Sequence, residues 1–108
     1  MTRYDLFCML FIALDADWDE THDEELGKYL SDANPVLFEG EGSAVSRIYT
    51  EFCNVITDEV ISKEKSYEIA KKYVKYLNNK AVTESFDLLE EAQWNDALNT
   101  YLDEKYGS

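Results

Sequence analysis

The chain has 108 residues, of which 45% are hydrophobic, and its 23 acidic and 10 basic side chains give a formal net charge of -13. This length suits one domain, residues 1–108, that can bury a core without disulfides or metals. A composition with one proline and four glycines argues against a fibrous or disordered chain. Because the charge repels phosphate backbones and anionic membranes, we expect a basic protein partner and no binding to nucleic acid or membrane.

The N-terminal segment, residues 4–14, is apolar nearly throughout and contains the run LFCMLFIAL. The run is about half as long as a membrane-spanning helix needs to be. Asp15 follows it at once and no small-residue cleavage site appears, so we interpret it as a core element of a cytoplasmic protein and not as a signal peptide. Periodicity alone does not separate helix from strand here. Since no other segment suggests a strand partner, we predict a buried helix.

Residues 15–25, DADWDETHDEE, carry seven carboxylates and are predicted to form an acidic turn. Within this segment, Thr21 and Glu24 fit a capping box that would begin the next helix. The apolar stripe of that helix runs as far as Ala33. Pro35 then ends the helix, because the residue before a proline avoids the α conformation.

The middle of the chain contains one loop, residues 34–43, and two amphipathic helices. Val36, Leu37 and Phe38 lie in the loop without a regular period, so they either fill the core beneath it or form an exposed binding patch. Ser43 and Ser62 are suited to cap the helices that follow them. The stripes of these two helices extend to Ile56 and Leu77, and the pair Asn78-Asn79 ends the second helix.

The last segment, residues 81–106, is helical by composition, but its apolar face changes direction along the chain. It is one helix or two, and the change of face favours two with a break near Glu91. The connections between helices are short, which is typical of antiparallel neighbours. The sequence therefore predicts an all-α, compact bundle of five or six short helices with a buried apolar N-terminal helix.

The charge is distributed unevenly along the chain. Residues 1–62 hold 3 basic and 14 acidic side chains, residues 63–80 hold 6 basic and 2 acidic, and residues 81–108 hold 1 basic and 7 acidic. The lysines of 63–80 would ordinarily pair with acidic neighbours on other helices. Alternatively, they or the apolar loop would contact a second copy of the chain, so a homodimer is a further possibility.

Several residue patterns argue against catalysis by a cysteine and against an EF-hand. Cys8 and Cys53 lie in apolar stretches outside any C-x-x-C motif, where reduced and unreactive thiols are expected. Asp15-x-Asp17-x-Asp19 opens like an EF-hand calcium loop. However, the positions that need a glycine and a glutamate hold Glu20 and Leu26. We therefore predict no metal site and no cofactor.

Histidine chemistry is limited as well, because His22 is the only histidine. A nucleophilic triad or a zinc site on one histidine is improbable on this composition. An enzyme with a carboxylate-bound divalent metal is the less favoured alternative. It would need the acidic turn to converge with Asp87 and Glu90.

Trp18 is an aromatic residue among carboxylates, an arrangement suited to docking a basic protein. We predict a partner-binding surface made of Asp15, Asp17, Trp18, Asp19, Glu20, Asp23 and Glu24. In surface chemistry the chain resembles bacterial immunity proteins and antitoxins, which bind cationic toxins through carboxylates that frame a few aromatic residues. The resemblance implies a non-enzymatic neutraliser of a basic protein, and no sequence motif contributes to it.

Overall fold

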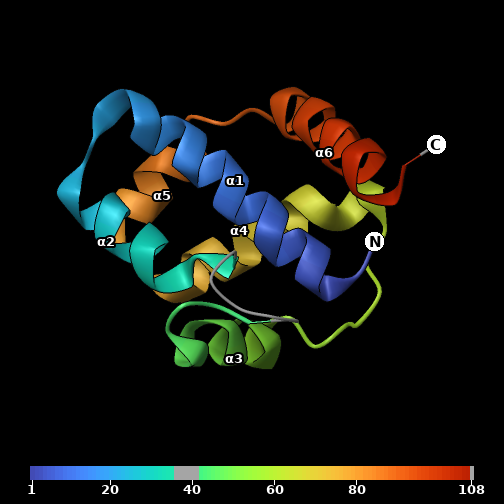
Figure 1. Cartoon of the computed structure of the whole chain (residues 1–108), viewed down its shortest axis with the longest axis horizontal. Helices are drawn as coiled ribbons and strands as arrows, with labels where there is room; N and C mark the ends of the chain where they lie inside the picture. Colours follow the sequence, from blue (N-terminus) through green and yellow to red (C-terminus); the bar gives the residue numbers. More distant parts are fainter. Residues whose placement is uncertain (36–41, 108) are drawn as a thin grey trace.

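A computed structural model describes residues 1–35 and 42–107, and these residues form six helices (Figure 1). The helices are α1 (Arg3–Thr21), α2 (Glu24–Ala33), α3 (Ser46–Val55), α4 (Lys63–Leu77), α5 (Lys80–Asp87) and α6 (Glu91–Tyr106). The described residues contain no strand, only an isolated antiparallel bridge between Thr2 and Val60. The predicted all-α bundle is confirmed, and residues 4–14 are helical. None of the helices described here combines the length and the hydropathy that a bilayer crossing requires.

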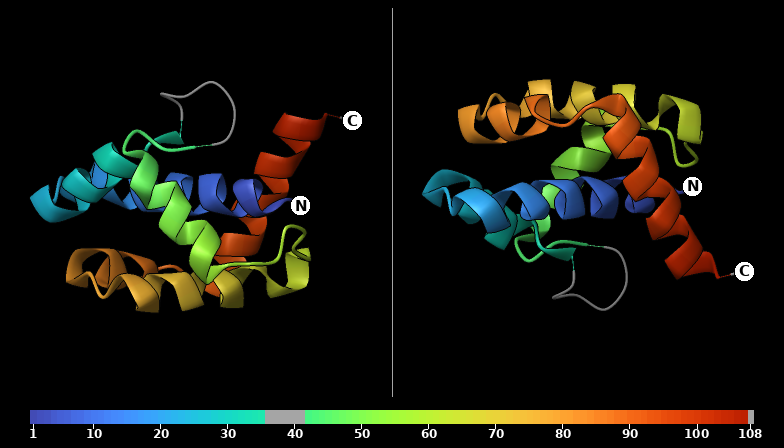
Figure 2. Two further views of the ribbon diagram at one scale, coloured as in Figure 1. Left: turned by 90° about the horizontal axis from the view of Figure 1, so that it is seen from below. Right: turned by 90° about the horizontal axis from the view of Figure 1, so that it is seen from above.

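The helices form two layers, with α1 and α2 in one and α4 and α5 in the other (Figure 2). Helices α3 and α6 close the two sides of the bundle. Helix α1 contacts all five of the others, which explains why its residues 4–14 are apolar nearly throughout. The core lies between the layers. Its largest fully buried side chains include Trp94, Tyr73, Phe52, Phe86, Leu6 and Met9.

Helix α1 is longer than the sequence predicted. It continues through Thr21 and ends at His22, which takes a left-handed conformation with φ 52°. Asp23 then caps α2, because its carboxylate accepts a hydrogen bond of 3.0 Å from the backbone N–H of Leu26. The predicted acidic turn is therefore wrong as far as Thr21, and the predicted capping box of Thr21 and Glu24 does not begin α2.

The physical reason lies in two apolar side chains that follow the N-terminal run. Leu14 is buried and Trp18 packs against the core, so the inner face of α1 continues one turn beyond Asp15. Exposed carboxylates are tolerated on the outer face of a helix whose inner face is packed. Tertiary packing thus overrides the turn-like local composition.

The other helix boundaries agree with the sequence more closely. Helix α2 ends at Ala33, directly before Asn34 and Pro35. Helix α4 ends at Asn78, which is left-handed with φ 49°, and Asn79 caps α5. Residues 81–106 do form two helices, separated at residues 88–90. The predictions for Val36–Phe38 fall outside the described residues.

Two serines take part in the starts of α3 and α4, although neither makes the predicted cap. Ser43 lies before the start of α3, and its hydroxyl accepts a hydrogen bond of 3.0 Å from the N–H of Tyr49. Ser62 occupies the residue before α4 but makes no capping hydrogen bond with its side chain. Both serines therefore mark helix starts, and only Ser43 stabilises one through its side chain.

Two pairs of polar groups inside the core join different helices. The indole N–H of Trp94 donates to the hydroxyl of Ser66 at 2.8 Å, and the hydroxyls of Tyr29 and Tyr73 are 3.0 Å apart. Burial raises the pKa of Tyr73 to about 12, so both phenols stay protonated at neutral pH. These bonds fix α6 on α4 and α2 on α4 in one register, because an unpaired buried hydroxyl is costly.

No acidic side chain in the described part of the chain pairs with a lysine of α4, contrary to expectation. The ion pairs among the described residues are Arg47–Glu51, Lys80–Glu84 and Lys105–Asp5, and none of them involves α4. The exposed lysines of α4 are Lys63, Lys65, Lys71, Lys72 and Lys75. They lie in the layer opposite α1, so the layer of α4 and α5 carries more basic side chains than the layer of α1 and α2 (Figure 2).

Candidate functional site

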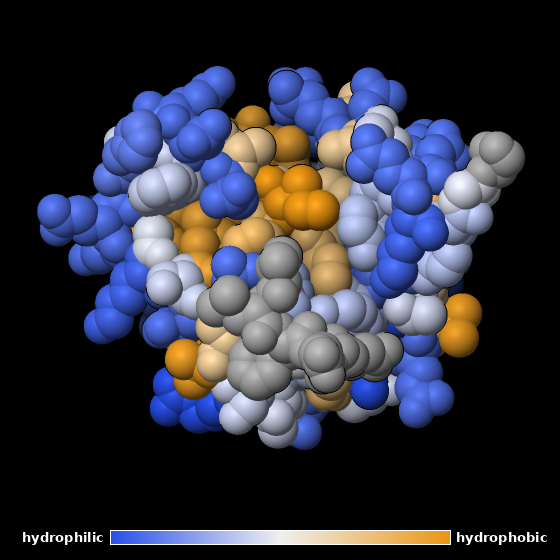
Figure 3. Space-filling view, viewed as in Figure 1, coloured by the Kyte–Doolittle hydropathy of each residue, from blue (hydrophilic) through white to orange (hydrophobic). Residues whose placement is uncertain are grey.

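Helix α1 leaves one apolar stripe at the surface. Ile12 is 45% exposed, and Cys8 and Phe11 beside it are half-buried. Figure 3 shows a hydrophobic area in the middle of this face, with hydrophilic residues to its left and right. A helix that is apolar all round is normally covered on every side. A contiguous exposed apolar patch with a polar rim is typical of an interaction site.

Two adjoining hollows follow this stripe. The first has a volume of about 250 Å³ and is lined by Tyr4, Cys8, Phe11, Ile12, Pro35 and Tyr101. The second has a volume of about 190 Å³ and is lined by Phe11, Asp15, Trp18, Gly27, Leu30, Ser31 and Asn34. Phe11 lines both hollows, so they adjoin each other, and we call the two together the α1 groove. Between Tyr4 and Trp18 it follows 14 residues of helix, or about 21 Å at 1.5 Å per residue.

Trp18 forms a fixed wall of the α1 groove. Its indole N–H donates a hydrogen bond of 3.1 Å to the backbone carbonyl of Asp23, and its ring meets His22 edge to face at 4.9 Å. The indole lies over Gly27, where a β-carbon would come within 2.7 Å of the ring nitrogen. Only glycine permits this close approach of α1 and α2.

We expect the variant Gly27→Ala to displace Trp18 with little net change in stability. Alanine gains about 1 kcal/mol in helix propensity, and the displaced indole loses a hydrogen bond of about the same value. Tryptophan emission should shift to longer wavelength as Trp18 enters water, because Trp94 stays buried. The neighbouring variant Lys28→Ala should leave the emission unchanged. An unshifted emission spectrum in Gly27→Ala would show that the position of the Trp18 indole does not depend on a glycine at residue 27.

The seven residues of the predicted surface do not all line one hollow. Asp15 and Trp18 line the α1 groove, whereas Asp17 and Glu20 line a separate hollow of about 340 Å³ that Ser85 also borders. Asp23 is used in the cap of α2. The two remaining residues, Asp19 and Glu24, are exposed and line no hollow described here. The helical twist of α1 directs Asp15 and Trp18 to one hollow and Asp17 and Glu20 to the other, and contact of the seven residues with a partner stays a prediction.

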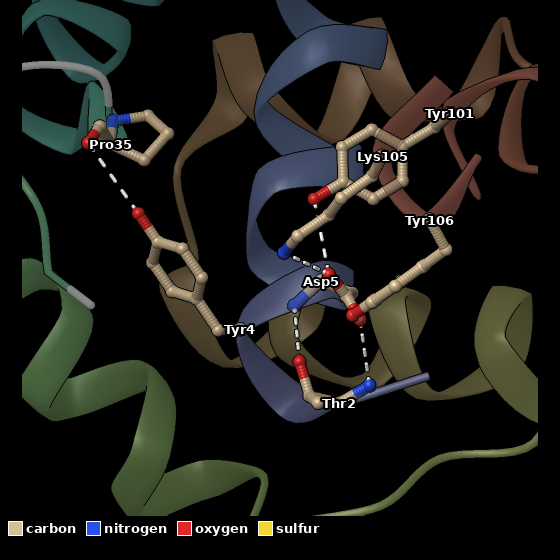
Figure 4. Close-up of polar contacts among 7 residues, drawn as sticks. All are labelled: Thr2, Tyr4, Asp5, Pro35, Tyr101, Lys105 and Tyr106. Atoms are coloured by element: carbon tan, nitrogen blue, oxygen red, sulfur yellow. Dashed lines mark hydrogen bonds and ion pairs between the residues drawn. The ribbon is translucent and has the colours of Figure 1, made fainter. Parts of the chain in front are cut away.

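Sequence reasoning missed a buried carboxylate at the N-terminal end of the groove. Asp5 is 0% exposed. It accepts hydrogen bonds from the hydroxyls of Tyr101 at 3.2 Å and Tyr106 at 2.6 Å, from the ammonium of Lys105 at 2.5 Å, and from the N–H of Thr2 at 2.9 Å (Figure 4). The cluster joins the first turn of α1 to the last turn of α6. Tyr101, a member of this cluster, also lines the first hollow, so the cluster adjoins the α1 groove.

The pKa of Asp5 results from two opposing effects. Burial by itself would raise it, but hydrogen bonds from Lys105, Tyr106 and Thr2 outweigh burial and hold it well below its usual range. Asp5 is therefore ionised at neutral pH. A carboxylate inside an otherwise apolar run was the sequence signal for such a site, because acidic residues are almost never fully buried without a partner.

Other chemistry receives little support from the geometry. Burial raises the pKa of the Cys8 thiol, which is the opposite of what activates a nucleophile. Cys8 and Cys53 are free thiols. In residues 1–35 and 42–107, no group of three or more His, Cys, Asp or Glu side chains is arranged to hold a metal ion.

Comparison of the chain with protein-family models, with curated proteins and with solved structures gives no significant match.

Proposed function

We propose that this protein binds a basic, amphipathic helical segment of a partner protein in the α1 groove. The observation that carries the proposal is an apolar floor that continues directly into carboxylates along one face of α1. Cys8, Phe11 and Ile12 supply the apolar part, and Asp15 follows one turn later. A helix in a groove is a recurrent mode of recognition that uses anchors at three- and four-residue spacing.

The charge of the groove favours a cationic partner. Asp15 lines the second hollow, and Asp19 follows one turn further along the same face of α1. A net charge of -13 would also attract a basic protein from a distance and speed its association at low salt. Neutralisation of a cationic protein, as bacterial immunity proteins and antitoxins do, is the biological role that we propose for such a surface.

The proposal is tested with a defined peptide probe and isothermal titration calorimetry. The probe is a leucine–lysine peptide of about 14 residues, which spans the groove, with leucines on one helical face. We expect it to bind at low salt and to bind more weakly at about 1 M salt, where the Debye length is about 3 Å. A scrambled peptide of the same composition should bind much more weakly. Equal binding of both peptides would reduce the interaction to non-specific charge attraction and contradict the proposal.

A pair of charge variants locates the binding surface within the molecule. Asp15→Lys changes the net charge by the same amount as Asp58→Lys, but Asp58 is exposed and lines none of the hollows described above. The groove variant should weaken peptide binding by about tenfold or more, as expected for a charge inside a recognition site. The Asp58 variant should have a small effect. Equal losses would mean that only the total charge matters.

A further inference from the structure

The side chains around Lys105 form an enclosure for an ammonium group. The Nζ atom of Lys105 lies 5.6 Å from the ring centroid of Tyr4, 5.8 Å from that of Tyr101 and 5.5 Å from that of Tyr106. All three distances are within the range of cation–π attraction. The same nitrogen forms an ion pair with the buried Asp5. We call Tyr4, Asp5, Tyr101 and Tyr106 the ammonium cage (Figure 4).

This arrangement exceeds what an ion pair between two helices requires. One carboxylate and one lysine suffice to join α1 to α6, whereas the cage adds three aromatic rings around a single cation. Such a combination of a carboxylate and several aromatic faces is typical of receptors for ammonium ligands. Because Asp5 is fully buried and ionised, the cage stabilises a cation and disfavours a neutral occupant.

The present occupant is positioned to leave the cage. The side chain of Lys105 is 37% exposed and lies in the last turn of α6. It can therefore rotate into solvent without opening the core. If a second ammonium group enters as Lys105 leaves, Asp5 keeps an ion pair, so the exchange avoids the cost of an unpaired buried charge.

The cage also lies where a bound partner would reach it. Tyr4 and Tyr101 belong both to the cage and to the first hollow of the α1 groove. A helix in the groove that meets Asp15 at one end would bring its other end to the cage. The two sites together offer carboxylates at both ends of an apolar floor.

We propose that the cage is a receptor for a lysine side chain, that Lys105 is its intramolecular occupant, and that a lysine of the partner replaces Lys105 on binding. The identity of the incoming ligand rests on the proposed function, whereas the cage as an ammonium receptor does not. Lys105 is then an intramolecular competitor. Any other ligand binds only while the cage is open, so its apparent affinity falls in proportion to the time that Lys105 occupies the cage.

The receptor is tested by chemical rescue of the variant Lys105→Ala with n-butylammonium, a mimic of the missing side chain. We expect n-butylammonium to raise the melting temperature of this variant more than that of the wild type. Sodium at equal ionic strength and neutral 1-butanol should not do so. Adding Asp5→Asn to Lys105→Ala should abolish the effect. Equal shifts in the wild type and Lys105→Ala, or rescue that survives Asp5→Asn, would overturn the proposal. If Lys105→Ala does not fold, Lys105→Gln serves in the same test.

The second experiment separates this proposal from the proposed function. Lys105→Ala should bind the leucine–lysine peptide roughly fivefold more tightly than the wild type does, because its competitor is gone. Rescue by n-butylammonium without peptide binding would support the cage and refute the groove. Equal peptide binding by both proteins without selective rescue would refute the cage and leave the groove intact.

Discussion

We expect the variant Asp5→Asn to lose about 2–3 kcal/mol of unfolding free energy, a fall of roughly 10 °C in melting temperature. Asparagine is neutral and would place an amide N–H₂ group among donors. Lys105 donates to Oδ1 of Asp5 and Tyr106 donates to Oδ2, and asparagine would leave only one acceptor oxygen for these donors. We place the value below that of a fully buried ion pair because the side chain of Lys105 is partly exposed and regains water. Urea or thermal unfolding followed by circular dichroism measures the difference.

A surface ion pair provides the matched control. Lys80 and Glu84 are 3.9 Å apart on the exposed side of α5, so Glu84→Gln makes the same acid-to-amide change without burial. Its effect should stay within about 0.5 kcal/mol. Similar losses in Asp5→Asn and Glu84→Gln would show that the buried cluster does not contribute specially to stability.

The effect of Asp5→Asn should depend on pH in a defined direction. The pKa of Asp5 is lowered in the folded protein. The stability that it contributes is therefore fully present above the ordinary aspartate pKa of about 3.9 and is lost as pH falls through the lower folded value. The gap between the wild type and the variant should close progressively below about pH 4. A gap that stays constant down to pH 2 would contradict an ionised Asp5.

We expect the variant Ile12→Glu to weaken binding of the leucine–lysine peptide by about thirtyfold or more, the effect of losing a central anchor worth about 2 kcal/mol. Ile12 lies on the floor of the α1 groove, where glutamate would put a charge against the apolar side of the peptide. Since Ile12 is already 45% exposed, the loss of stability should be only about 0.5–1 kcal/mol. Titration calorimetry measures the affinity and thermal unfolding confirms the fold.

Leu88→Glu is the control for this experiment. Leu88 is 70% exposed and lines the hollow that contains Asp17 and Glu20, on the other flank of α1. The variant Leu88→Glu adds the same charge as Ile12→Glu at another exposed apolar site. Its affinity for the peptide should stay within about threefold of that of the wild type, as for residues outside a hot spot. The reverse order of effects would move the binding surface from the groove to that flank.

Much of the fold could be predicted because four helices are short and amphipathic. The stripes of α2, α3, α4 and α5 bury one face each, and residues such as Asn78 and Pro35 end helices for local steric reasons. Helix α1 differs because its residues 4–14 touch other helices on nearly every side, and the acidic residues that follow have the composition of a turn although they continue the helix. The last turns of α1 depend on the contact between Trp18 and Gly27 of α2, and the residue pattern of α1 alone does not indicate this contact.

The candidate site was harder to predict than the fold. Asp15 and Trp18 were identified because an aromatic residue among carboxylates stands out in the sequence. The α1 groove was not identified from the sequence. Its position depends on which side of the apolar helix α1 the neighbouring helices leave uncovered. The ammonium cage joins Asp5 to residues about a hundred positions away, Tyr101, Lys105 and Tyr106. Spacing along the chain carries no information about such a contact.

Cys8 offers the most direct test of the α1 groove as a docking surface. Its thiol lines the first hollow, whereas Cys53, the other thiol of the chain, lines neither hollow of the groove. The measurement is the rate of iodoacetamide alkylation at each thiol, read by mass spectrometry with and without the leucine–lysine peptide. We predict that the bound peptide slows alkylation of Cys8 and leaves that of Cys53 unchanged. Peptide binding that leaves Cys8 as reactive as before would contradict the groove as the binding site.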